Sequence, residues 1–296
     1  MEFILQDHYC YRVELLPHKS PWRWIEYCGR IAYKSHDKIT NDSAMKFCER
    51  LSKLGHTSVF GHSNIVVWLR DKSEIERWAK FCFNYPHESA FHRWVHTDNG
   101  LYINGNIVAW TQTMKAAGKA ELVFLEKTFE GLPLTYDMDS GYIINDHNNI
   151  PESLLRMTAI INTNRLITHE LVRHRPVADY TQESTRYCKY QGQIRLCSRT
   201  DVFNDSQTVL EQCFKKYDEL CQKYSREHAR GLLPHMLSAQ IAVTHDIGND
   251  KYGWKYIYKL RSSKEAAPQI RQVMESVKYL AQETYNINIG GKDNAN

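Results

Sequence analysis

The arginines between residues 173 and 186 are the side chains in this sequence best suited to bind an anion. Arg173, His174 and Arg175 are consecutive, and Arg186 follows in the next loop. A guanidinium group presents a planar fork of donors that matches a phosphate or the edge of a pyrimidine ring. The segment also contains groups that can orient a ligand, namely Gln182, Ser184 and Thr185. The pattern favours a site for a nucleotide phosphate or a ribityl-phosphate chain.

The same composition also fits a solvated basic turn, in which these arginines pair with Glu170, Asp179 and Glu183. On local composition alone, the solvated turn is the better interpretation. Two other arginines favour a binding site, because Arg230 precedes a proline-started segment and Arg261 follows an aromatic run. Each is weak evidence alone, since an arginine near a helix C-terminus commonly interacts with the helix dipole.

A zinc hydrolase is the first alternative, because His169 and His174 resemble the HExxH motif with one residue too many. At about 100° per residue, side chains five positions apart lie about 140° apart and cannot easily share a metal. The eight cysteines include no CxxC pair. We therefore expect no metal site and reduced, mostly structural cysteines.

The composition predicts a folded protein with a sizeable core, since 42% of the 296 residues are apolar and 24% are charged. The longest apolar runs, such as Ile65–Leu69, are too short to cross a bilayer, and the first residues do not resemble a secretory signal. We expect a cytoplasmic protein without a membrane partner. The net charge of +4 gives no indication of a nucleic-acid partner.

Apolar periodicity predicts the elements that must position these side chains. Predicted strands are Ile65–Leu69, Leu101–Ile103 and Met157–Ile161. Predicted helices are 21–35, Asp42–Leu54, 73–82, Ile107–Lys127, Asn164–His174 with Asn164 as N-cap, Val209–Tyr224 with a stop at Gly231, Pro234–Val243 and Pro268–Tyr285.

Arg-His-Arg followed by a spacer and Ser-x-Arg-Tyr resembles the signature of the flavin-dependent thymidylate synthases, the ThyX family. Other segments resemble this family in the same order: Arg30–Ser35, Gly55–Phe60, Asn104–Trp110, Ala229–Pro234 and Arg261–Arg271. The sequence departs from the family in three places. The spacer from Pro176 to Glu183 has eight residues instead of seven, Gly61 replaces an acidic residue, and Asp246 replaces an asparagine.

The resemblance implies an α/β fold with an antiparallel-rich central sheet flanked by long helices. It also implies one catalytic domain over residues 1–289, an enlarged insertion at about 70–155, and a flexible tail over 290–296. The implied reaction is the reductive methylation of dUMP to dTMP, with methylenetetrahydrofolate as carbon donor, FAD as carrier and NADPH as reductant. The protein supplies binding and electrostatics in such a reaction. A homotetramer that shares its sites between subunits is also implied.

The resemblance assigns roles to individual residues. The implied flavin contacts are His56, Ser58, Arg173, His174, Arg175, Gln182 and Asp246. The implied dUMP contacts are Glu170, Arg173, Gln182, Glu183, Ser184, Thr185, Arg186, Arg230 and Arg261. Ser184 and Arg261 are the implied catalytic residues, with Arg261 polarising the uracil toward attack at C5 and Arg230 contributed by a neighbouring subunit. His62 is expected to be a hydrogen-bonded structural histidine.

Two further alternatives stay open. A relative on the same fold could methylate or hydroxymethylate C5 of another pyrimidine nucleotide, such as UMP or dCMP. The chain could also be a non-catalytic protein that binds nucleotides or RNA.

Overall fold

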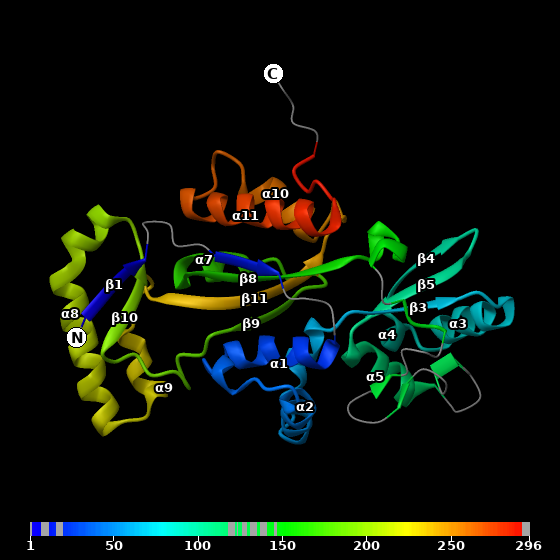
Figure 1. Cartoon of the computed structure of the whole chain (residues 1–296), viewed down its shortest axis with the longest axis horizontal. Helices are drawn as coiled ribbons and strands as arrows, with labels where there is room; N and C mark the ends of the chain where they lie inside the picture. The colour runs from blue at the N-terminus through cyan, green and yellow to red at the C-terminus, as the bar shows by residue number, and fades with distance from the viewer. Residues whose placement is uncertain are drawn as a thin grey trace.

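A four-stranded antiparallel sheet forms the centre of the protein (Figure 1). The computed structural model describes residues 2–6, 12–15, 20–117, 122, 124–125, 129–130, 135–136, 141–144 and 147–291. The strand order is β2 (Arg12–Leu15), β8 (Arg156–Asn164), β11 (Ser238–Asp246) and β9 (Asp179–Gln182). All three neighbouring pairs are antiparallel, so the expectation of a mixed fold with an antiparallel-rich sheet is confirmed.

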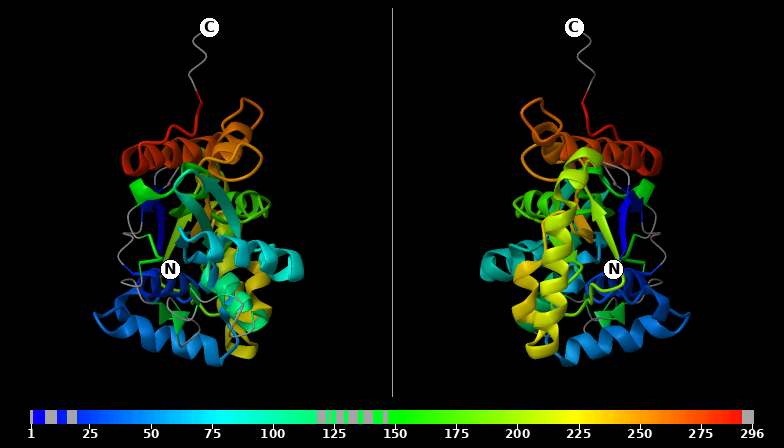
Figure 2. Two further views of the ribbon diagram at one scale, coloured as in Figure 1. Left: turned by 90° about the vertical axis from the view of Figure 1, so that its right-hand side faces the viewer. Right: turned by 90° about the vertical axis from the view of Figure 1, so that its left-hand side faces the viewer.

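Helices cover the two faces of this sheet, because side chains alternate between the faces along each strand. On one face, Met157, Ala159 and Ile161 of β8 pack with α7 (Arg165–Leu171), α10 (Trp254–Arg261) and α11 (Pro268–Tyr285). On the other face, Ile160 and Ala242 pack against the cluster that contains α1 (Pro21–Ile31) and α2 (Ser43–Lys53). Figure 2 shows α11 and α1 on opposite sides of the sheet in both views.

The predicted insertion contributes to a second sheet, of order β3 (Ile65–Leu69), β5 (Gly100–Gly105) and β4 (Arg93–Thr97). Its helices are α3 (Lys72–Asn84), α4 (Pro86–Ser89) and α5 (Ile107–Ala116), and a short hairpin pairs β6 (Phe129–Glu130) with β7 (Thr135–Tyr136). Trp78, Trp110 and Phe124 are buried together in the same core as α1. The insertion is therefore packed directly onto the α1 side of the protein.

A third group of elements lies at the other end of the central sheet (Figure 1). There β1 (Glu2–Gln6) pairs in parallel with β10 (Gln193–Cys197), beside the long helix α8 (Thr200–Lys223) and the short helix α9 (Arg226–Ala229). Phe214 and Tyr217 of α8 are fully buried against Leu196 of β10. Short 3-10 turns complete the chain: η1 (His36–Lys38), η2 (Thr57–His62), η3 (His147–Asn149), η4 (Glu152–Leu154) and η5 (Arg230–Leu232).

Several predicted elements are confirmed and others are wrong. The helices α2, α3 and α11 and the strand β3 lie where periodicity placed them, and Asn164 caps α7 by accepting from the Ile167 amide. The segment Pro234–Val243 is not a helix, because most of it forms β11. The helix predicted from Val209 begins earlier, at Thr200, and ends at Lys223. The helices α1, α5 and α7 are shorter than predicted.

Some expectations fall partly on residues that the structure does not describe. Of the predicted tail, residues 292–296 lie outside the described ranges. The seven cysteines within those ranges carry free thiols. Within the same ranges, no helix combines the length and the apolar character needed to cross a membrane.

Candidate active site

Glu170, His174 and Arg261 form a hydrogen-bonded group, called here the Arg261 cluster. Arg261 Nε donates to His174 Nε2 at 3.0 Å, and Arg261 Nη1 lies 3.0 Å from Glu170 Oε2. Arg261 Nη2 also lies 3.5 Å from the Glu170 carbonyl oxygen. These contacts fix the plane of the guanidinium group, so three of the predicted site residues meet in one place.

The backbone around His174 explains why its side chain is held in this position. Helix α7 ends at Leu171, and the His174 carbonyl oxygen accepts from the Tyr180 hydroxyl and from His245 Nε2. Arg261 is the last residue of α10, which begins after Gly253 at a φ of 90°. A side chain at Gly253 would be strained and would meet the Asp246 backbone. The cluster therefore depends on contacts between α7, β9, β11 and α10.

The imidazole of His174 is neutral near pH 7. Burial, with a further contribution from the Arg261 charge, lowers the pKa of His174 to about 4. Since Nε2 accepts a hydrogen bond from Arg261, the ring proton resides on Nδ1. The histidine thus orients the arginine without adding a positive charge.

His169 does not share a partner with His174. The ring of His169 lies 5.2 Å from the ring of His235, whereas His174 contacts Arg261. The two imidazoles of the extended HExxH-like sequence therefore contact different parts of the protein.

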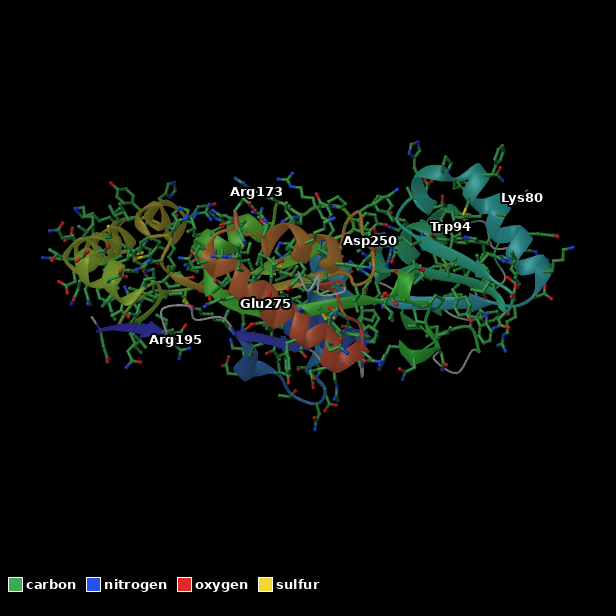
Figure 3. All side chains as sticks on the ribbon, turned by 90° about the horizontal axis from the view of Figure 1, so that it is seen from above. Lys80, Trp94, Arg173, Arg195, Asp250 and Glu275 are labelled. Atoms are coloured by element: carbon green, nitrogen blue, oxygen red, sulfur yellow. The ribbon has the colours of Figure 1, made fainter. Side chains whose placement is uncertain are left out.

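The loop after His174, where the longer spacer begins, contains a left-handed turn. Val177 has a φ of 55°, which is unusual for a β-branched residue. Arg173 and Arg175 on either side of His174 are exposed, and Arg173 projects outward from the ribbon in Figure 3. Strand β9 begins two residues after Val177, so Asp179 and the residues after it keep a regular antiparallel register with β11.

Four charged residues form a largely buried ion-pair network below this loop: Arg93, Arg156, Asp179 and Asp246. Arg156 Nη2 contacts Asp179 Oδ2 at 2.7 Å, and Arg93 Nη1 contacts Asp246 Oδ2 at 2.5 Å. Arg156 Nε also lies 3.6 Å from Asp246 Oδ1. Burial raises the pKa of Asp246, and the two arginines act in the opposite direction. Asp246, a predicted flavin contact, is fully buried within this network.

Asp179 occupies the space next to Gly61, where the family has an acidic residue. A Cβ atom added at Gly61 would lie only 1.8 Å from Asp179 Oδ1. The Arg156 guanidinium spans both segments, since it donates to the carbonyl oxygens of Gly61 and Val177. Two of the departures from the family pattern, at Gly61 and in the longer spacer, are therefore in direct contact.

Gln182 and Glu183 are adjacent in the chain but contact opposite sides of the sheet. Gln182 Nε2 donates to Thr168 Oγ1 of α7 at 2.9 Å. The Glu183 carboxylate instead accepts from the Tyr190 hydroxyl and lies 2.9 Å from Lys34 Nζ, in the segment after α1. Only Gln182 of this pair therefore points toward the side of the Arg261 cluster.

The remaining predicted nucleotide contacts lie at the α9 end of the protein. Ser184 begins a turn, in which its Oγ accepts from the Arg186 amide at 3.2 Å and Thr185 is half-buried. Arg186 Nε pairs with Glu227 of α9 at 3.1 Å, and exposed Arg230 follows α9 directly. Figure 1 shows α9 and α10 on opposite sides of the central sheet. Within one chain, these residues and the Arg261 cluster are not brought together.

The η2 turn carries one structural histidine and two exposed predicted contacts. His56 and Ser58 are exposed at its beginning. His62 is buried, with Nδ1 at 2.7 Å from Thr244 Oγ1 and Nε2 at 2.9 Å from Thr181 Oγ1. Burial lowers the pKa of His62 to about 4. The expectation that His62 is a hydrogen-bonded structural residue is confirmed.

A cavity of about 360 Å³ opens beside Arg175. Arg156, Asp179 and the exposed ring of Phe91 contribute to its lining. The sequence analysis did not identify Arg93 or Arg156. The sequence held one signal, a charged residue at the end of each of two strand-like segments: Arg156 begins β8 and Asp246 ends β11. The structure shows that the two residues are register partners in the sheet.

The fold and the site together define a mixed α/β protein with an arginine-rich site on loops at the edge of an antiparallel sheet. Residues 141–285 match the family described as thymidylate synthase complementing protein. Three curated relatives are each named flavin-dependent thymidylate synthase. The relative from Thermococcus onnurineus is 30% identical over 139 residues, that from Pyrococcus horikoshii 29% over 146, and that from Pyrococcus furiosus 29% over 147.

Each of these alignments covers 43% of this chain and 54% of the relative. The chain therefore spans about half the length of the curated relatives it matches. Through residues 141–285, which include the Arg261 cluster, the chain is a relative of the flavin-dependent thymidylate synthases. The resemblance found in the sequence is confirmed.

Proposed function

We propose that this protein is a flavin-dependent thymidylate synthase that converts dUMP to dTMP, with methylenetetrahydrofolate as carbon donor, FAD as carrier and NADPH as reductant. The observation that carries the proposal is the Arg261 cluster, which lies within the segment that matches the family. The names of the relatives support a flavin enzyme.

Arg261 would polarise the uracil ring. A guanidinium group has five N–H donors. Its contacts to Glu170 and His174 use three of them, which leaves two donors for a carbonyl oxygen of the substrate. The guanidinium is held in place before the substrate binds, so little reorganisation is needed when negative charge develops on that oxygen. The neutral His174 adds no second positive charge beside Arg261.

The cavity beside Arg175 fits an anionic aromatic cofactor. Arg175 and Phe91 are both exposed where they line it, which offers a cation for phosphate and an apolar ring for stacking. The flavin supplies the hydride and the carrier chemistry when it is bound. We assign its binding to Arg173, Arg175, His56 and Ser58, with His174 as the residue that orients Arg261.

A shared site explains why the predicted nucleotide contacts are divided within one chain. Arg186 and Arg230 lie beside α9, and Arg261 lies at the end of α10. A homotetramer could bring the α9 end of one chain to the Arg261 cluster of another. In that arrangement Ser184, Thr185, Arg186 and Arg230 would bind the nucleotide held by Glu170, Gln182 and Arg261 of a neighbour.

The test is tritium release from dUMP labelled at C5, measured on protein loaded with FAD, with UMP and dCMP assayed in parallel. We expect release from dUMP, and we expect Arg261→Lys to lower kcat strongly because lysine keeps the charge but lacks the planar fork. The matched control is Arg199→Gln, which removes an exposed arginine paired with Asp201 and leaves the activity unchanged.

A flavin-loaded protein that releases tritium only from UMP or dCMP would reassign the substrate. A protein that cannot be loaded with flavin but binds nucleotides would refute the proposed enzyme and support a non-catalytic binding protein. Mass measurement in solution tests the tetramer, and a monomer with full activity would refute the shared site.

A further inference from the structure

A second cavity, of about 400 Å³, lies on the face of the central sheet opposite the Arg261 cluster. Lys34, in the segment after α1, lines it together with Asn162 of β8, Gln240 of β11 and Arg195 of β10. Asn162 and Gln240 lie two residues from Ile160 and Ala242, so they share the α1 face of the sheet. Of the predicted dUMP contacts, only Glu183 lines this cavity.

The charges around this α1-side cavity favour an anionic ligand. The buried Glu183 carboxylate is already compensated by Lys34 at 2.9 Å and by the Tyr190 hydroxyl. Lys34 is held in a left-handed backbone conformation with a φ of 48°, a strained arrangement that is often found at ligand sites. Within the described residues, Lys189 and Arg195 line the cavity and have no ion-pair partner, and the exposed carboxylate of Asp37 also lines it, so two cations without ion pairs stand against one carboxylate. These two cations are free to bind a phosphate.

The two carboxamides in the cavity offer one donor and one acceptor. Gln240 Nε2 donates to Asn162 Oδ1 at 3.0 Å. This bond leaves Asn162 Nδ2 as a donor and Gln240 Oε1 as an acceptor. Together they complement the adjacent carbonyl and N–H groups of a uracil or thymine ring. Cytosine offers an acceptor beside a donor only at N3 and its exocyclic amine, one ring position away from the O2 carbonyl and N3–H of uracil, so a cytosine nucleotide held by its phosphate meets Asn162 and Gln240 less well.

We infer that the α1-side cavity is a second nucleotide site, which binds a phosphorylated uracil or thymine nucleoside. Lys189 and Arg195 bind the phosphate, and Asn162 and Gln240 bind the edge of the base. The volume falls within the range of about 300–1,000 Å³ that is usual for small-molecule sites. The inference rests on the proposed function only for the presence of pyrimidine nucleotides as substrate and product. The residues that carry the inference belong to a face that does not contain Arg261.

The experiment measures the binding of labelled dTMP to the full chain by equilibrium dialysis. The Arg261→Gln chain disables the proposed active site and is expected to retain about one equivalent of dTMP per chain. Adding Lys189→Gln and Arg195→Gln to it should weaken this remaining binding by at least about tenfold, because two charge-assisted contacts are lost. Adding Arg199→Gln instead serves as the control for an exposed arginine and should leave the binding unchanged.

Competition with dCMP and with inorganic phosphate tests how the base is bound. Both should compete less well than dUMP, and Asn162→Ala should weaken dTMP binding while leaving phosphate binding unchanged. Loss of all dTMP binding in the Arg261→Gln chain would overturn the second site. Equal competition by phosphate would overturn the role of Asn162 and Gln240.

The result of this binding experiment can be told apart from the result of the tritium-release assay that tests the proposed function. A chain that binds dTMP in this way but releases no tritium from dUMP refutes the proposed activity alone. A chain that releases tritium but loses all dTMP binding with Arg261→Gln refutes the second site alone. Lys189 and Arg195 are exposed, so their substitution should leave the thermal unfolding midpoint unchanged and folding can be verified in the same samples.

Discussion

Replacing Asp246 with asparagine removes a buried negative charge and keeps the shape of the side chain. Asp246 contacts Arg93 at 2.5 Å and Arg156 at 3.6 Å. The Asp246 side chain is 1% exposed, and those of Arg93 and Arg156 are 15% and 4% exposed. In the Asp246→Asn variant, the network keeps two arginines and a single carboxylate, that of Asp179, which contacts only Arg156 of the two. The ion-pair network therefore acquires an uncompensated positive charge in a region that water scarcely reaches.

The expected cost in the free energy of unfolding is about 3–5 kcal/mol, the range found when one partner of a buried ion pair is removed. The control is Asp201→Asn, which breaks an ion pair of 2.6 Å with Arg199. Both side chains of that pair are more than half exposed, so its loss should cost less than about 1 kcal/mol. The two pairs have nearly the same length and differ mainly in burial.

Urea unfolding of the three proteins, followed by circular dichroism, measures both changes. The reasoning predicts a large fall in the midpoint for Asp246→Asn and a small one for Asp201→Asn. Adding Arg93→Met to Asp246→Asn should cost less than the sum of the single changes, because it removes the unpaired charge. Equal midpoints for the two asparagine variants would refute the importance of burial, and full additivity would refute the coupling.

Two other predictions concern pH and steric contact. His62 and His174 have a pKa of about 4 in the folded protein, against about 6.5 when unfolded. Because the folded pKa is depressed, the stability present above pH 6.5 should be lost as the pH falls toward 4, by up to about 1.4 kcal/mol per pH unit for each histidine. Urea midpoints at pH 7 and pH 5 measure this, and an equal or higher midpoint at pH 5 would contradict it. Gly61→Ala forces a Cβ atom to 1.8 Å from Asp179 Oδ1 and should cost about 1–3 kcal/mol. Gly231→Ala, which has no atom within 4 Å of the new Cβ, should leave the thermal midpoint unchanged, so equal midpoints for both alanine variants would exclude the predicted clash.

Periodicity predicted the elements whose apolar residues repeat on one face. The helices α2 and α11 have such a stripe and were placed correctly. The strand β11 was predicted as a helix because Pro234 resembles a helix start, and because the strand is buried on both faces and shows little alternation. The strand β9 has only four residues, too few to show a period, and its position depends on pairing with β11. Such pairing joins residues about sixty positions apart and is not visible in a local window.

The family resemblance assigned the three residues of the Arg261 cluster to the site, His174 as a flavin contact and Glu170 and Arg261 as dUMP contacts, but their hydrogen bonds to one another were not predicted because they join residues distant in sequence. Arg261 and Glu170 are 91 positions apart in the chain. The sequence placed Gln182 and Glu183 in one group, but the alternation of the chain sends them to opposite faces. The ion pair between Lys34 and Glu183 was not predicted, because nothing in the segment after α1 indicates that Lys34 has a partner so far along the chain.

The contact between Gly61 and Asp179 also restricts the order in which these positions can change during evolution. Any side chain at position 61 would enter the space of the Asp179 carboxylate, as long as Arg156 holds that carboxylate in place. A smaller residue at position 179 must therefore come first, and an acidic residue at position 61 could then supply a carboxylate near Arg156. The reverse order passes through a clashing intermediate, so selection would favour one of the two mutational paths.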